Sequence, residues 1–143
     1  MATSASFTLA TQLPTNITSS LSMANDKQHF ATLSRELASN SSQWIYRLDY
    51  YDTTPTLLES IDVYSTYNVN KHFLTFTPTT SQRELIAVAT NKNIIFYQTN
   101  PLELMKSELH RQANVYDLTA SPNGELVVLV GQSIVVYRVI GFK

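Results

Sequence analysis

The chain has 143 residues, no cysteine and a formal net charge of −1 at pH 7. This length suits a single domain with its own core, and the lack of cysteine excludes disulfides, thiol catalysis and thiolate metal sites. The near-neutral charge excludes a general basic field that would attract nucleic acid or an anionic membrane.

The first 15 residues carry no charged side chain. They lack the basic start and long apolar centre of a secretory signal, so we expect a flexible N-terminus in which Phe7–Thr11 is a possible closing strand. No apolar run is long enough to span a bilayer. Because cysteine is also absent, we expect a cytoplasmic or nuclear protein.

Residues 16–66 form the first of three predicted repeats. Strand-like runs lie at Leu21–Met23, His29–Leu33, Trp44–Leu48 and Thr56–Tyr64. Branched and aromatic residues favour strands in these runs, and Asn25-Asp26 supplies a turn between the first two.

Residues 67–110 form the second repeat. It has strands at Leu74–Pro78, Glu84–Val88 and Ile94–Tyr97, followed by Leu102–Leu109. This last segment is compatible with a helical turn or two, but its place after a third strand favours an outer strand.

Residues 111–143 form the third repeat. Pro122-Asn123-Gly124 predicts a tight turn, since Pro fixes φ and Asn and Gly tolerate positive φ. Glu125–Val130 and Ser133–Tyr137 follow as strands joined by Gly131-Gln132. An outer strand is missing from this repeat.

A tyrosine ends the third strand of each repeat, at Tyr46, Tyr97 and Tyr137. An all-strand repeat of about 40 to 50 residues is typical of propeller blades. The inner strands are almost continuously apolar, which predicts sheets that are covered on both faces. We therefore expect an all-β fold of antiparallel four-stranded blades.

The third repeat resembles a WD-repeat blade. Such blades begin with a His, continue with an apolar strand and a Ser-Pro-Asp/Asn-Gly turn, and end in Trp-Asp. Here the matching residues are His110, Val115, Leu118, Ser121-Pro122-Asn123-Gly124 and, in place of Trp-Asp, Tyr137-Arg138. The chain departs from the pattern because no repeat keeps Trp-Asp, and Gln132 and Lys92 lie near the place of the turn Asp. The resemblance covers about residues 17 to 140 and implies a rigid platform that binds macromolecules without catalysis.

Three blades are fewer than the four to eight that close a propeller. Open blades expose apolar faces and strand edges, so we expect a partial, WD-like β-propeller that is incomplete as a single chain. The first expectation is that it forms the N-terminal part of a longer propeller. The alternatives are completion by a partner chain or by a second copy.

The sequence predicts no catalytic, cofactor or metal site. His29, His72 and His110 are far apart and lack ligand-like neighbours, which favours structural roles. Glycines are too few for a phosphate loop, and the basic residues are scattered among acids, so nucleic acid is not an expected partner. Asp49 and Asp52 suggest a carboxylate pair, but a strand end followed by a turn explains them more simply.

Four tyrosines at strand ends or connections are the candidate interaction residues: Tyr50, Tyr51, Tyr64 and Tyr67. Tyr buries a large area at low entropic cost and is enriched in binding hot spots, although packing between blades would also use it. We expect a non-catalytic protein-interaction scaffold within a larger complex. The alternative is a phosphoinositide-binding propeller, although the paired arginines of that family are missing.

Overall fold

The computed structural model describes residues 4–12, 17–37, 44–63, 72–78, 84–90, 93–110, 114–121 and 123–140. These residues form three antiparallel β-sheets and no helix. The first sheet has four strands in chain order: β1 (Ile17–Met23), β2 (His29–Leu37), β3 (Trp44–Asp52) and β4 (Leu57–Val63).

The second sheet also has four strands in chain order: β5 (His72–Pro78), β6 (Glu84–Thr90), β7 (Asn93–Gln98) and β8 (Glu103–His110). The third sheet has three: β9 (Val115–Ala120), β10 (Glu125–Val130) and β11 (Ser133–Arg138). The prediction of an all-β chain with antiparallel sheets is confirmed, and β8 is the expected outer strand rather than a helical turn.

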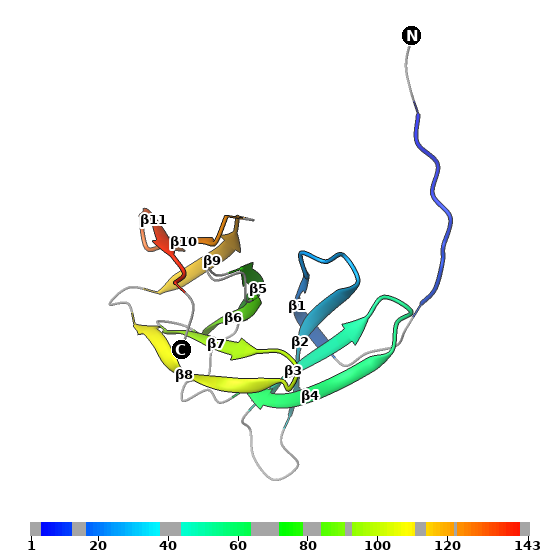
Figure 1. Cartoon of the computed structure of the whole chain (residues 1–143), viewed down its shortest axis with the longest axis horizontal. Helices are drawn as coiled ribbons and strands as arrows, with labels where there is room; N and C mark the ends of the chain where they lie inside the picture. The colour runs from blue at the N-terminus through cyan, green and yellow to red at the C-terminus, as the bar shows by residue number, and fades with distance from the viewer. Residues whose placement is uncertain are drawn as a thin grey trace.

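The three sheets follow one another side by side, and their first strands meet. Strand β1 contacts β5, and β5 contacts β9. Figure 1 shows β1, β5 and β9 along the inner side of the array, with β4, β8 and β11 on its outside. The third sheet lacks a strand beyond β11 among the described residues, so β11 is its outer edge.

Two hydrophobic cores join the sheets, one on each side of the second sheet. The first core fills the space between the first and second sheets with Leu33, Leu48, Ile86, Val88 and Tyr97 among its members. The second core joins the second and third sheets through Leu85, Ala87, Ile94, Leu126 and Val128, among others.

Strand β6 supplies both cores because successive side chains of a strand point to opposite faces. All five residues from Leu85 to Ala89 are buried, which confirms the prediction of a strand covered on both sides. The same prediction is wrong for β10. Leu126 and Val128 are buried, whereas Leu129 is 42% exposed, because no described element covers that face.

The three repeat tyrosines occupy the third strand of their sheets but not equivalent faces. Tyr97 pairs with Ile86, and Tyr137 pairs with Leu126, so both point toward the preceding sheet. Tyr46 lies in the core with the following sheet. The expected threefold equivalence is therefore wrong for Tyr46. A shift of one residue along a strand moves every side chain to the other face.

Polar groups also connect the first and second sheets. The Ser22 hydroxyl accepts a hydrogen bond from the Phe76 amide at 3.2 Å. The Glu59 carboxylate accepts one from the Leu102 amide at 3.0 Å. These contacts fix the second sheet against the first at both the inner and the outer strands.

The turn before β10 has the predicted chemistry. Gly124 has φ 86°, a conformation that a side chain disfavours. The Ser121 carbonyl accepts a hydrogen bond from the Gly124 amide at 3.3 Å, and the Ser121 hydroxyl accepts one from the Glu125 amide at 3.3 Å.

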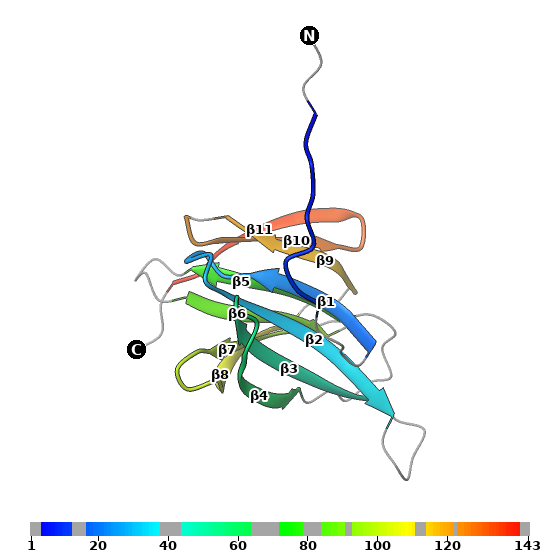
Figure 2. The same cartoon turned by 90° about the vertical axis from the view of Figure 1, so that its right-hand side faces the viewer.

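Residues 4–12 run away from the sheets as an extended arm, as both views show (Figures 1 and 2). Phe7 is 93% exposed and Leu9 76% exposed. The predicted closing strand Phe7–Thr11 belongs to none of the three sheets in this structure.

Candidate interaction surface

Of the four candidate tyrosines, Tyr50 lies inside the fold. It is 4% exposed and stacks on the His29 ring, with the centroids 5.3 Å apart. The Phe76 ring lies 6.3 Å away at a tilt of 48°. Burial, followed by the nearby charges of Asp26 and Glu84, raises the pKa of the Tyr50 hydroxyl.

Tyr51 points to the opposite face of the first sheet. Its ring stacks on Phe30 with a centroid distance of 5.0 Å, and it is 7% exposed. Burial raises the pKa of the Tyr51 hydroxyl, while a hydrogen bond with the Thr32 side chain opposes that rise. The structure thus separates Tyr50 from Tyr51. Tyr64 and Tyr67 lie outside the described residues, and a role for these four in partner binding stays a prediction.

The turn between β1 and β2 carries a polar cluster that sequence reasoning missed. The Asp26 carboxylate lies 2.6 Å from His29 Nδ1. The half-buried Glu84 accepts a hydrogen bond from the Asn25 amide at 3.0 Å. Burial raises the pKa of Asp26, but hydrogen bonds from Gln28 and His29 outweigh it and lower the pKa overall. For Glu84, burial prevails and raises the pKa. The sequence did contain a signal for this cluster, because Asp26 lies in a predicted turn three residues before His29.

Asp49 and Asp52 do not form the carboxylate pair that their spacing suggested. Three positions along a strand place them on opposite faces. The Ser60 hydroxyl donates to Asp49 at 2.5 Å, and the Thr56 amide donates to Asp52 at 2.8 Å. Both carboxylates therefore serve local structure. Asp52 lies at the strand end, as the simpler explanation expected, whereas Asp49 lies inside β3. The described residues hold no group of three or more acidic or His side chains placed to bind a metal ion.

An open apolar surface lies on the side of the third sheet that is turned away from the second sheet, which we call its distal face. Cross-strand pairs Val127–Val136 and Leu129–Ile134 form its centre. Ile134 is 74% exposed and Val136 54% exposed. On the neighbouring strand β9, Thr119 pairs with Val127 and Asp117 pairs with Leu129, so both lie on the same face. Large exposed apolar patches mark interaction sites.

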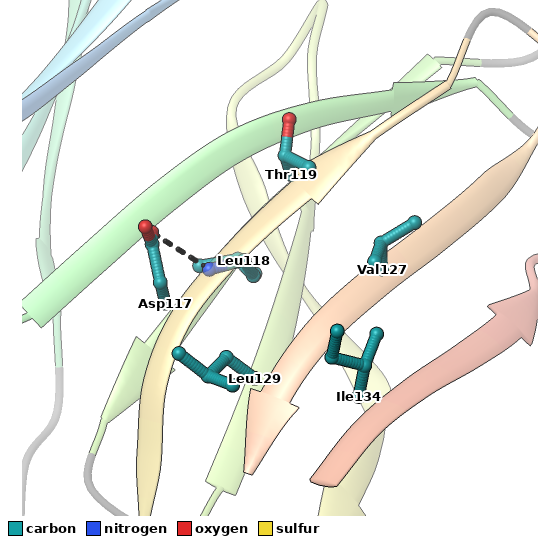
Figure 3. Close-up of a pocket in the computed structure, with 6 residues that line it drawn as sticks. All are labelled: Asp117, Leu118, Thr119, Val127, Leu129 and Ile134. Atoms are coloured by element: carbon teal, nitrogen blue, oxygen red, sulfur yellow. Dashed lines mark hydrogen bonds between the residues drawn. The ribbon is translucent and has the colours of Figure 1, made fainter.

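A groove of about 230 Å³ runs along this distal face. Figure 3 shows Val127 and Leu129 of β10 beside Ile134 of β11. The lining residues are Asp117, Leu118, Thr119, Val127, Leu129 and Ile134. The Asp117 carboxylate accepts a hydrogen bond from the Leu118 amide at 2.9 Å. Apart from Asp117 and Thr119 the lining side chains are apolar, so the groove is mainly apolar.

Sequence reasoning missed this groove because a continuous apolar run does not reveal which of its faces is covered. Val127 and Leu129 look as buried in the sequence as Ala87 and Ala89 do. The available signal was the count of three predicted repeats, because only a further sheet would cover this face, whereas an outer strand after β11 would extend the sheet at its edge.

No helix among the described residues is long and apolar enough to cross a membrane. Comparison with known proteins matched the chain to no family model and to no curated relative.

Proposed function

We propose that this chain is a non-catalytic protein-interaction scaffold, the N-terminal part of a WD-like β-propeller that acts within a larger complex. The observation that supports it most is the distal face of the third sheet. Four apolar side chains lie there at adjacent positions, next to the edge strand β11. Such a surface favours a macromolecular partner over bulk water.

The arrangement of the sheets supports the propeller part of this proposal. Successive antiparallel sheets of three or four strands pack face to face with their first strands on the inner side. Blades of a propeller follow one another in this way. Fold alone does not specify function, so the proposal depends on the distal face.

The polar clusters support a structural role rather than a reaction centre. Asp26 and His29 hold the turn at the end of β1, and Asp52 holds the turn before β4. Each carboxylate accepts backbone amides, which is what turn residues do.

Affinity capture from an extract tests the function when it is paired with a surface variant. Wild type and Ile134→Glu are immobilised in parallel, together with the control Leu104→Glu, which changes an exposed leucine of β8. The proposal expects a protein that wild type and the control retain and that Ile134→Glu loses. That protein must then bind the purified chain directly.

Flotation with vesicles of phosphatidylcholine, with and without phosphatidylinositol phosphates, is the second arm. Flotation that requires phosphoinositide, together with no direct protein partner, would overturn the scaffold proposal in favour of the lipid-binding alternative.

A further inference from the structure

We infer that the distal face of the third sheet is covered by a second copy of this chain. The contact surface of that copy is the side of its first sheet that is turned away from its second sheet, which we call the distal face of the first sheet. This inference rests on the scaffold part of the proposed function, and it names a second copy, in place of further sheets of a longer chain, as the partner that completes the propeller.

Both internal contacts use the same pair of faces. Ala31 and Leu33 of β2 in the first sheet pack in one core with Ile86 and Val88 of β6 in the second sheet. The second sheet then turns the other face of β6 toward Leu126 and Val128 of β10. Each sheet therefore packs one face on the next sheet in chain order, and we call this its forward face. The opposite face, which we call its receiving face, packs on the preceding sheet.

The distal face of the third sheet is the next forward face. Its apolar pairs Val127–Val136 and Leu129–Ile134 have the layout of Ala87–Phe96 and Ala89–Ile94 in the second sheet. In the second sheet these pairs are buried by the third sheet. In the third sheet the same arrangement is open to solvent.

The distal face of the first sheet is the matching receiving face. Leu21 and Met23 lie on it at the inner strand β1, where they are 67% and 49% exposed. Register places them beside Thr32 and Phe30, on the side away from Ser22 and Ala31. Internal contacts between sheets are also made at the inner strands, so the exposed leucine and methionine lie where a sheet would arrive.

Three pairs of polar groups on this receiving face already bind each other within the face. Arg47 Nε donates to Asp62 at 3.3 Å, Ser60 donates to Asp49 at 2.5 Å, and Tyr51 and Thr32 are hydrogen bonded. Buried polar groups are costly when they lose their partners. These groups would keep theirs under a second copy.

A second copy carries a forward face and a receiving face on one array of sheets. A head-to-tail contact of this kind closes when its rotation returns to the start. Two copies would bring together twice the three sheets that the described residues form, within the usual range of about four to eight blades.

Light scattering during size exclusion, at concentrations from about 1 to 100 μM, tests this directly. The expected result for wild type is a species of twice 16.1 kDa. Ile134→Glu/Val136→Glu alters the forward face, and Leu21→Glu/Met23→Glu alters the receiving face. Each is expected to weaken association by about 100-fold or more, since charge is buried without a partner. The control Leu104→Glu is expected to associate like wild type.

Mixing the two double variants is the decisive arm. In the mixed pair, one interface joins an intact forward face to an intact receiving face, and the other joins the two altered faces. A mixed dimer should therefore form through the intact interface, more weakly than wild type, although neither variant pairs with itself. Circular dichroism of each variant should match wild type. A restored dimer also shows that neither variant has simply unfolded.

Three outcomes would overturn the inference. The first is a wild-type monomer across the whole range, and in that case a partner captured through Ile134 would still uphold the scaffold function. The second is a dimer that survives Leu21→Glu/Met23→Glu, which would mean that two third sheets meet. The third is a dimer lost on deletion of residues 1–12 but kept in both double variants, which would mean exchange of the arm.

Discussion

Replacement of Ile86 by Ala tests the packing of the first sheet on the second. Ile86 is fully buried on β6, in the core shared by these two sheets. The change removes three carbons, which carry about 2.4 kcal/mol at about 0.8 kcal/mol each. Incomplete collapse around the cavity raises the expected loss of unfolding free energy to about 3–4 kcal/mol.

The matched control is Ile140→Ala, because Ile140 is 70% exposed and follows the last strand. Its expected effect is within about 0.5 kcal/mol. Urea denaturation followed by circular dichroism measures both variants at one protein concentration, so that any association affects them equally. Equal losses in the two variants, or a loss below about 1 kcal/mol for Ile86→Ala, would refute the stacked arrangement of the first two sheets.

Three further variants test the turns and the carboxylates, each by thermal or urea denaturation. Gly124→Ala should destabilise by about 1–2 kcal/mol because φ is 86° there, and a neutral result would contradict that backbone conformation. Burial raises the pKa of Glu84, so its ionised form costs stability as pH rises above the unfolded value. Glu84→Gln should therefore stabilise at pH 7 and lose this advantage near pH 3, whereas a pH-independent difference would count against burial as the cause. Hydrogen bonds from Thr54 and Thr56 lower the pKa of Asp52, so Asp52→Asn should destabilise at pH 7, with the difference shrinking as pH falls through the folded pKa. A difference that grows toward acid would show that the carboxylate is not held by these hydrogen bonds.

The order of strands follows from the sequence because turn residues and apolar runs are local signals. Pro122-Asn123-Gly124 between two apolar runs predicted the β9–β10 hairpin, and the positive φ of Gly124 agrees with it. The face of the sheet to which each side chain points was harder to predict. Leu85 and Leu126 align as the second residues of similar runs, yet Leu85 points to the third sheet and Leu126 to the second. Register depends on pairing with neighbouring strands, which composition does not encode.

The candidate site was predicted only in part for the same reason. Tyr50 and Tyr51 are adjacent in sequence, but the pleat sends them to opposite faces, where each stacks on a different ring. The apolar distal face was hidden among runs that resembled core. Its exposure follows from its place on the last described sheet. The count of three repeats predicted an open apolar face, but not which side chains of β10 and β11 lie on it, since that depends on pairing register.

The double burial of β6 makes five consecutive residues a built-in reporter of both sheet contacts. Replacing Leu85, Ala87 or Ala89 disturbs the contact with the third sheet, whereas replacing Ile86 or Val88 disturbs the contact with the first. A probe placed at successive positions along this strand would report alternately on the contact with the third sheet and the contact with the first sheet. Loosening of either neighbour would then appear as a change at every second position.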